Sequence, residues 1–342
     1  MNRFLNTAAA ILVALGLSAG CSKDDTETPD KATPVTLRMA TQFPENHPAH
    51  AATLRIKDAV EKGTEGRINI TIFPESQLGS PEQVYDGVSS GSIDAAHIRI
   101  PDQADPRLGT GDLPYIAADY RELKHVFAPE AFIPVQVAKL LKKKDVKFFG
   151  YYIEGFVGVG TTGEAQNLTN LGTDKGIVVS VSGLEAIKTG IQALGFRTTA
   201  LPYTDVHAAL QAGVVDGWAG GPPSLNYSGF SDVITTYYQL NCNVQSSQYI
   251  MSMKAFKSFS APDQEVIARA FAAEGQNSFD IAEQEDIGYR RKLTEAGVTV
   301  NEFSRHELRA MADYVRDKTW PELDKTLTRK WMEGLKEWYS AQ

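Results

Sequence analysis

The sequence predicts an α/β fold of two similar lobes that face each other across a cleft. The first observation is an internal repeat, because residues 82–96 (EQVYDGVSSGSIDAA) align without a gap on residues 204–218 (TDVHAALQAGVVDGW), at a constant offset of 122 residues. Both segments are typical of a short helix, a glycine stop, a hydrophobic residue and an aspartate. The second is that predicted strands and helices alternate in both halves, as in right-handed βαβ units. The third is the length of 342 residues, which allows two domains.

The first 34 residues are predicted to lie outside both lobes. Residues 1–20 carry an arginine and then a short apolar run, which is typical of an export signal and too short to span a bilayer. The segment LSAGC, ending at Cys21, is typical of a bacterial lipoprotein signal in which Cys21 becomes the lipidated first residue. The alternative is an ordinary secretory signal with an incidental cysteine. Residues 21–34 are polar and contain proline, so we predict a flexible tether.

Strands in the first half are predicted at 35–40, 68–73 and 93–100. One helix is predicted at about 49–65, where apolar residues recur at helical spacing. A second starts at Pro81, with Ser80 as its capping residue. This strand–helix order implies a largely parallel sheet.

The second half repeats the same order after a helix at 134–144 and a strand-rich segment at 147–160. Strands are predicted at 177–181 and 197–201, and helices at 182–194 and 204–213. Val214 and Val215 are predicted to start a strand that Asp216-Gly217 breaks, with Trp218 at its carboxyl end, where ligands bind in open α/β sheets. A return strand at 249–253, a helix of about 50 Å at 262–296 and a final helix from Ser304 complete the chain.

Several motifs together resemble the extracytoplasmic solute receptors of TRAP transporters, of the dicarboxylate-receptor type. The resemblance covers about Val35 to Tyr339. The motifs are Phe43-x-x-x-His47-Pro48, Ile72-Phe73-Pro74-x-Ser76-Gln77-Leu78-Gly79, Gly91-x-Ile93-Asp94, Asp112-Leu113-Pro114-Tyr115 and Leu210-Gln211-Ala212-Gly213-Val214-Val215-Asp216-Gly217. The resemblance implies a two-lobed periplasmic-binding-protein fold, type II-like, with interlobe strands and a long shared helix. It also implies capture of a small organic solute by lobe closure and delivery to the small and large membrane subunits of a permease.

The chain departs from the family at three ligand-binding positions. The family usually has an arginine on the first strand of the second lobe to anchor a ligand carboxylate, and Ser180 stands there. Val157 follows Gly155-Phe156 where a second arginine is usual, and Ala219 begins the segment where Glu-Asn-Pro is usual. We therefore predict an atypical ligand, less acidic or aromatic.

The predicted ligand-binding residues are aromatic or polar and lie on the first loop, the strand ends, the interlobe strands or the second lobe. They are Phe43, His97, Arg99, Tyr151, Phe156, Ser180, Trp218, Asn226 and Gln245, with Tyr152 as a further aromatic candidate.

A structural role is the alternative for several of these residues. Arg99 would either grip an anion in the cleft or pair at the surface with Asp102 or Asp105. His97 would either donate to a ligand oxygen or be a buried structural histidine. Trp218 would either stack on the ligand or pack within its lobe.

Asp94 and Asp216 occupy the same place in the repeat, after a predicted strand, which favours turn capping over an acid pair. His47 is predicted to shape its loop rather than to bind metal. Cys242 is the only cysteine besides Cys21, so no disulfide is predicted in the processed chain. We expect Cys242 to be a small buried residue, the alternative being a reactive thiol.

Composition excludes other function classes. The net charge of −8 offers no basic surface for nucleic acid. The sequence contains no HExxH, P-loop or CxxC motif, and we predict no enzyme activity, metal or cofactor.

We therefore expect a periplasmic lipoprotein anchored to the membrane through Cys21. The first lobe is predicted at 35–157 and 247–285, and the second at 158–246 and 286–342. The alternatives are a ligand-sensing ectodomain or binding lipoprotein that is not coupled to a permease, and an enzyme on a binding-protein fold.

Overall fold

The computed structural model describes residues 34–181 and 185–341. The predicted export signal, Cys21 and the predicted tether up to residue 33 lie outside the described residues, as do the first three residues of the helix predicted at 182–194. Within the described ranges, no helix combines the length and the apolar character that crossing a membrane requires.

The first sheet has five strands in the order β2-β1-β3-β10-β4. They are β1 (Val35–Thr41), β2 (Ile68–Phe73), β3 (Ala95–Ile98), β4 (Val146–Phe156) and β10 (Val244–Ser252). Strand β1 runs parallel to β2 and β3, whereas β10 is antiparallel to β3 and β4. The predicted strands are therefore confirmed, but the sheet is mixed because the long strands β4 and β10 run in opposite directions beside the parallel βαβ unit.

The second sheet has six strands in the order β11-β9-β5-β8-β6-β7. They are β5 (Val159–Thr161), β6 (Val178–Val181), β7 (Arg197–Ala200), β8 (Gly217–Ala219), β9 (Thr236–Tyr238) and β11 (Thr299–Asn301). Strand β6 is parallel to β7 and β8, and β5 is antiparallel to β8 and β9. Each sheet thus combines parallel βαβ pairing with antiparallel strands.

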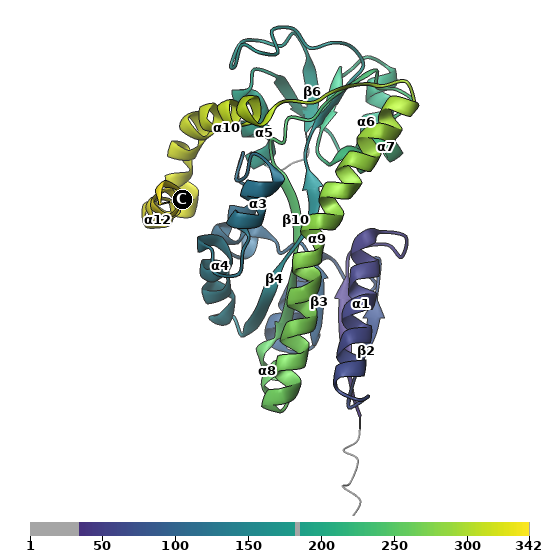
Figure 1. Cartoon of the computed structure of the whole chain (residues 1–342), viewed down its shortest axis with the longest axis vertical. Helices are drawn as coiled ribbons and strands as arrows, with labels where there is room; N and C mark the ends of the chain where they lie inside the picture. Colours follow the sequence, from purple (N-terminus) through teal and green to yellow (C-terminus); the bar gives the residue numbers. More distant parts are fainter. Residues whose placement is uncertain (1–33, 182–184, 342) are drawn as a thin grey trace, which may run out of the picture. The chain divides into compact units, whose positions relative to one another are not determined.

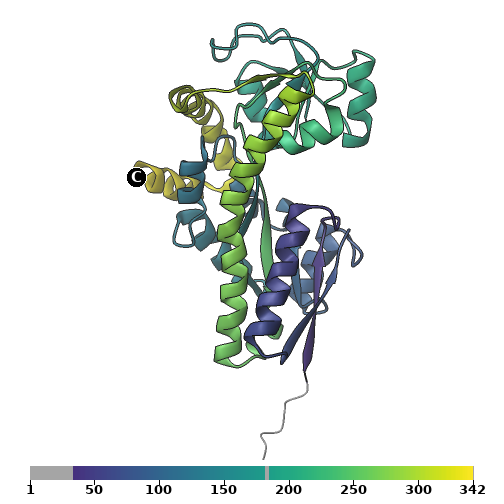
Figure 2. The same cartoon turned by 45° about the vertical axis from the view of Figure 1, so that its right-hand side comes forward.

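Twelve α-helices of the described residues cover these sheets. They are α1 (Pro48–Gly63), α2 (Pro81–Ser90), α3 (Tyr120–Val126), α4 (Phe132–Lys142), α5 (Glu185–Ala193), α6 (Tyr203–Gln211), α7 (Pro223–Phe230), α8 (Met253–Lys257), α9 (Ala261–Glu295), α10 (Arg305–Thr319), α11 (Asp324–Leu327) and α12 (Arg329–Ser340). Helix α9 passes both sheets (Figures 1 and 2), since it contacts β4 of the first and β11 of the second. At about 1.5 Å per residue its 35 residues extend about 50 Å, as predicted.

The internal repeat is confirmed down to individual hydrogen bonds. In the first unit the Asp94 carboxylate accepts from the Arg38 amide on β1 at 2.8 Å. In the second the Asp216 carboxylate accepts from the Val178 amide on β6, also at 2.8 Å. Gly91 and Gly213 end the preceding helices with φ of 81° and 67°, a conformation that favours glycine. Both carboxylates thus have the structural role expected of them, but they bind the backbone of a neighbouring strand and not the turn that the sequence predicted.

The strand predicted to begin at Val214 is wrong in its position. Strand β8 begins at Gly217, after the aspartate, and Val214 lies in a turn with 66 % of its surface exposed. The reason is that Asp216 ties its carboxylate and its own amide to Val178, which lets regular pairing with β6 start only at the next residue. Trp218 consequently lies in the middle of a strand and not at its end.

Two connections join the sheets. Strand β4 leads into β5, and β9 returns to β10 beside it. The Val157 amide donates to the Asn243 carbonyl at 2.9 Å, and the Cys242 amide donates to the Val157 carbonyl at 3.1 Å. Cys242 is fully buried here, as predicted, and burial raises the pKa of its thiol to about 12, so the thiol is not reactive at neutral pH.

The C-terminal helices pack on the first sheet. Trp320, Trp331 and Leu335 belong to the same hydrophobic cluster as Ile133 of α4 and Phe156 of β4. Figure 1 shows α12 near α4 at the side of the first sheet. The chain thus returns to its first half after building the second sheet.

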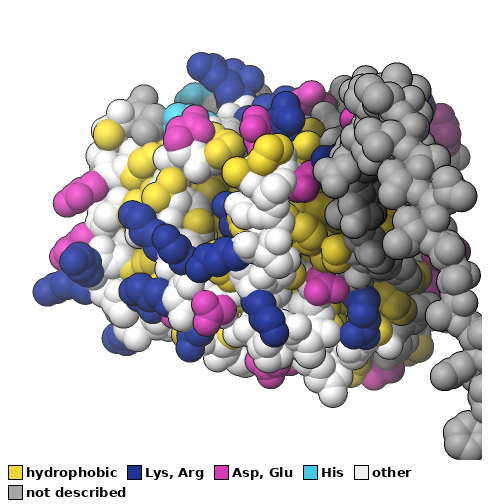
Figure 3. All heavy atoms as spheres, turned by 90° about the horizontal axis from the view of Figure 1, so that it is seen from below, with side chains coloured by type: hydrophobic (Ala, Val, Ile, Leu, Met, Phe, Trp, Pro, Cys, Tyr) yellow, Lys and Arg dark blue, Asp and Glu magenta, His cyan; other side chains and the backbone are white. Residues whose placement is uncertain are grey.

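The surface carries charges of both signs. On the face that Figure 3 shows, Lys and Arg side chains alternate with Asp and Glu and with hydrophobic side chains. The lysine run 142–144 is exposed at the end of α4, where cations favour the helix dipole.

Candidate functional site

A cavity of about 240 Å³ lies where the elements of the two sheets meet. One wall comes from the first sheet, through the loop before α1, strand β4 and strand β10. The opposite wall comes from the start of α7, which packs on the second sheet, and α9 closes one side. The lining residues are Asn46, His47, Pro48, Tyr152, Ile153, Glu154, Pro222, Ser224, Leu225, Ser228, Gln245, Ile281, Ala282, Glu285 and Tyr289.

Glu154 is the carboxylate in the wall formed by β4. Gln245 on the neighbouring strand β10 donates to it through Nε2 at 3.0 Å. Burial raises the pKa of Glu154 to about 7, while nearby Arg99 and the contacts with Ser247 and Gln245 act to lower it. A carboxyl group that changes its protonation near neutral pH therefore faces the cavity.

A buried hydrogen-bond chain leads from α1 to Ser247 on β10. Thr53 donates its hydroxyl to the Ala49 carbonyl at 2.9 Å, so its oxygen accepts from Nδ1 of His97 at 3.1 Å. His97 Nε2 then accepts from the Ser247 hydroxyl at 3.0 Å. Burial, with the neighbouring His47, holds the pKa of His97 well below its ordinary value, so the ring is neutral. The structure thus gives His97 the buried structural position that was its alternative role.

Arg99 is not among the residues that line the cavity. Its guanidinium donates to Asp112 at 2.5 Å, and its backbone amide donates to Gln42 at 2.9 Å. Burial raises the pKa of Asp112, and Arg99 acts against that rise. Arg99 therefore forms an ion pair, but with Asp112 and not with Asp102 or Asp105, the partners considered from the sequence.

The predicted residues of the second sheet lie inside its core. Trp218 is 4 % exposed and packs on Phe230 with ring centroids 4.8 Å apart. Ser180 pairs with Trp218 across β6 and β8, and its buried hydroxyl has no hydrogen-bond partner in the described chain. Asn226 donates to the Gly221 and Pro222 carbonyls at 3.2 and 3.1 Å, which shapes the start of α7. These side chains do not line the cavity.

The predicted aromatic residues of the first sheet divide into two groups. Tyr151 and Phe156 of β4 are buried in the hydrophobic core of the first sheet. The ring of Phe156 meets that of Tyr120 edge to face, with centroids 4.9 Å apart. Phe43 is also buried but stacks on His47, a cavity residue, at 4.7 Å. Only Gln245 of the nine predicted residues lines the cavity itself, together with the further candidate Tyr152.

Sequence reasoning missed the two carboxylates of the cavity, Glu154 and Glu285. Glu154 directly precedes Gly155-Phe156, the motif after which the family usually has an arginine. Its place beside that motif was therefore an available signal. Glu285 lies in a helix with many charged residues, and nothing in its spacing distinguishes it from solvent-facing neighbours.

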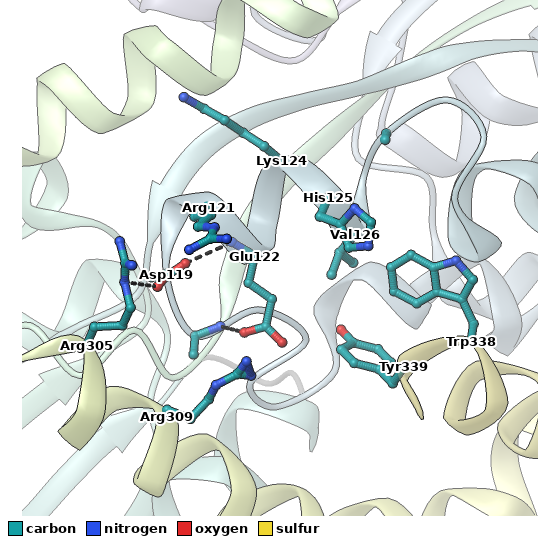
Figure 4. Close-up of a pocket in the computed structure, with 12 residues that line it drawn as sticks. Asp119, Arg121, Glu122, Lys124, His125, Val126, Arg305, Arg309, Trp338 and Tyr339 are labelled. Carbon is teal, nitrogen blue, oxygen red and sulfur yellow. Dashed lines mark hydrogen bonds and ion pairs between the residues drawn. The ribbon is translucent and has the colours of Figure 1, made fainter. Parts of the chain in front are cut away.

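A larger hollow of about 710 Å³ lies among α3, α10 and α12 (Figure 4), but its charges are largely paired. Asp119 pairs with Arg305 at 3.0 Å, and Glu122 pairs with Arg316 at 2.7 Å. Figure 4 shows Lys124 directed away from the other labelled side chains. We regard this hollow as a groove between helices, since it contains no residue from either sheet.

No group of three or more His, Cys, Asp or Glu side chains in the described ranges is placed to hold a metal ion. The cavity therefore offers hydrogen-bonding and charged side chains, not a preformed metal centre. Its chemistry fits noncovalent binding of a small polar molecule.

Comparison with known proteins gives the family. The family model described as bacterial extracellular solute-binding protein, family 7, matches residues 39–324. The C4-dicarboxylate-binding periplasmic protein DctP of Rhodobacter capsulatus is 23 % identical over 307 residues, which covers 88 % of this chain and 87 % of that protein. The sialic acid-binding periplasmic protein SiaP of Vibrio cholerae is 22 % identical over 237 residues, 69 % of this chain and 73 % of that one.

Solved structures show the same fold. A TRAP periplasmic solute-binding protein from Ochrobactrum anthropi has a TM-score of 0.78 at 19 % identity, covering 91 % of this chain and 96 % of that chain. One from Sulfitobacter sp. with bound β-D-galacturonate has a TM-score of 0.70 at 19 % identity, covering 90 % and 100 %. The predicted two-lobed α/β fold is confirmed, and the chain belongs to the bacterial extracellular solute-binding proteins of family 7.

Proposed function

We propose that this protein is the extracytoplasmic solute receptor of a TRAP-type transporter and that it has no enzymatic activity. The observation that carries the proposal is the cavity between β4, β10 and α7, because its walls come from both sheets. A solute that contacts both walls favours the state in which they are close together. The closed receptor then delivers the solute to the small and large membrane subunits of a permease.

We propose that the moving bodies follow the expected ranges, 35–157 with 247–285 and 158–246 with 286–342, except at the carboxyl end. Residues 320–340 share the hydrophobic cluster of the first sheet, so we assign them to the first lobe. In this proposal the hinge consists of the two connections between the sheets, at Val157 and at Cys242. Backbone hydrogen bonds hold these two segments side by side.

The solute is atypical for the family in this proposal. Three of the relatives are named or solved with acids: a C4-dicarboxylate, sialic acid and β-D-galacturonate. Here the position of the usual anchoring arginine is Ser180, whose hydroxyl is buried and unpartnered. The lining of the cavity contains no lysine or arginine, so a carboxylate would find no guanidinium there.

A metabolite library tested by thermal shift checks the receptor function. We expect one or a few related small solutes to raise the melting temperature of the purified processed chain. The shift should grow with solute concentration, as mass action requires for a ligand that binds the folded state. Turnover of any stabilising solute would contradict a purely binding role, and a library without any stabilising solute would count against the receptor function.

The membrane anchor is a separate part of the proposal, and it depends on the LSAGC segment. Replacing Cys21 with serine is expected to move the protein from the membrane fraction to the soluble periplasmic fraction, because the acyl chains that hold it are lost. Fractionation followed by immunoblotting measures this, with Cys242→Ser as the matched cysteine control. Equal membrane retention of both variants would contradict anchoring at Cys21.

A ligand-sensing ectodomain that feeds no permease is the second candidate. Genes for a small and a large membrane subunit beside this gene are expected under the transport proposal. Their absence, with a signalling gene in their place, would favour the sensor.

A further inference from the structure

We propose that the solute carries an organic ammonium group and that the carboxylate of Glu154 binds it. Gln245, Tyr152 and Glu285 supply further acceptors around the same cavity. This inference rests on the proposed receptor function and names the chemical class of its solute.

The first argument is that the cavity presents acceptors that lack donors. Gln245 donates through Nε2 to Glu154 at 3.0 Å. Its Oε1 is buried and has no hydrogen-bond partner in the described chain. Tyr152, which is only 2 % exposed, also lines the cavity and brings a hydroxyl oxygen that can accept a hydrogen bond. Buried polar atoms are nearly always satisfied in native proteins. A ligand that donates N–H groups would satisfy them here.

The second argument is charge. The cavity lining contains Glu154 and Glu285 and no lysine or arginine. His47 is the one basic side chain in that lining, and burial lowers its pKa, so it is neutral at physiological pH. A carboxylate ligand would therefore meet two acidic side chains and no cation, whereas an ammonium ion would favour the ionised form of either carboxyl and pair with it.

The nearest guanidinium does not change this balance. Arg99 lies close enough to Glu154 to lower its pKa, but Arg99 is bound to Asp112 at 2.5 Å. The pair together is close to neutral, and neither residue lines the cavity. A ligand anion would have to break this ion pair to reach the guanidinium.

The third argument is the proton state of Glu154. Burial raises its pKa to about 7, although its contacts with Gln245 and Ser247 act to lower that pKa, so the carboxyl exchanges a proton near neutral pH. The charged or titratable groups around Glu154 are His97 on β3, Arg99 after β3, Asp112, His47, Tyr152, Glu285 and Tyr289. An ammonium ligand would favour the ionised carboxylate and release its proton. The affinity for amines should therefore rise as the pH is raised from 6 to 8.

A matched set of four-carbon compounds tests the ligand class by calorimetry on the processed chain. Putrescine, 1,4-butanediol and succinate share a chain length but end in ammonium, hydroxyl or carboxylate groups. Primary amines of two to six carbons extend the series. We expect binding by one or more amines, no binding by the matched alcohols and acids, and proton release on binding at pH 6.5. Binding of the acids without the amines would overturn this inference but leave the receptor function standing. Failure of every amine, while another library solute stabilises the protein, would do the same.

Variants at the cavity connect binding to Glu154. Glu154→Gln is expected to weaken amine binding about 10- to 100-fold, since it removes a charge-assisted hydrogen bond, and to flatten the pH dependence. Glu265→Gln is the matched control, because Glu265 lies on α9 with 69 % of its side chain exposed. The melting temperature of each unliganded variant reports whether it folds. Equal amine affinity in both folded variants would overturn the assignment.

Discussion

Replacing Asp286 with asparagine is expected to gain about 2–3 kcal/mol of stability relative to the wild type as the pH is raised from 5 to 8. Asp286 of α9 is 2 % exposed and accepts from the Tyr120 hydroxyl at 2.5 Å and from the Phe156 amide at 3.3 Å. Burial raises its pKa to about 7, against the lowering effect of those hydrogen bonds. The folded state therefore holds a proton that the unfolded chain has already released.

This difference in proton binding determines whether the free energy of unfolding rises or falls with pH. A carboxyl group with a raised folded-state pKa stabilises the protein fully below the unfolded pKa and loses that contribution as the pH rises through about 7. Asparagine cannot ionise, so the variant avoids the loss. His97 acts oppositely, because burial lowers its pKa and the folded state resists the proton that the unfolded chain takes up below about pH 6.5. The wild-type curve therefore sums opposing contributions, to which Glu154 adds in the direction of Asp286, so the difference between variants carries the test.

Urea unfolding at pH 5 and pH 8 measures the effect. Asp280→Asn is the matched control, because Asp280 lies on the same helix with 79 % of its side chain exposed and pairs with Lys124. We expect no gain with pH in that variant. A destabilisation of Asp286→Asn by the same amount at both pH values would show that the carboxyl proton is not the source of the effect.

Replacing Trp331 with alanine is expected to destabilise the protein by about 3–5 kcal/mol. Trp331 of α12 is 8 % exposed and donates its indole N–H to Thr110 at 3.0 Å. Its ring meets Phe132 of α4 edge to face at 5.6 Å, and the Arg107 guanidinium lies 5.6 Å from its centroid. The substitution thus creates a cavity between the C-terminal helix and the first sheet and leaves a buried hydroxyl without its donor.

Trp338→Ala in the same helix is the matched control. Trp338 is half-buried and stacks on His125 at 5.1 Å, so we expect a smaller loss, on the order of 1 kcal/mol. Denaturant unfolding of both variants gives the comparison. Equal losses, or a loss below about 1 kcal/mol for Trp331→Ala, would contradict the packing of α12 as part of the first lobe's core.

Local patterns were sufficient for most of the architecture. The capping residues Ser80 and Ser304 start their helices where the sequence predicts, each with a complete capping box. The aspartates of the repeat cap strands in both halves, because the same short segment places the same carboxylate against a neighbouring strand. The error at Val214 arose because hydrophobicity and a breaking Asp-Gly do not show on which side of the aspartate strand pairing begins.

The candidate site was much harder to predict from the sequence. Arg99 follows a strand near the expected cleft, but its side chain binds Asp112. Trp218 lies on such a strand, but its ring packs into the core beside the second sheet. Strand alternation places side chains on two faces, but both faces of a central strand are covered, so alternation does not tell which face borders the cavity. Gln245 was predicted as a neutral polar contact, and its partnership with Glu154 was not.

The sequence by itself determined that this protein has two related α/β units and a long helix that contacts both sheets. These properties depend on local periodicity, capping and single residue identities. Only the tertiary structure decided which side chains share a cavity. Glu154, Gln245 and Glu285 come from β4, β10 and α9, so they meet only after these three elements have packed together. The raised pKa of Glu154 has the same origin, since burial is its main cause and burial is a property of the assembled fold.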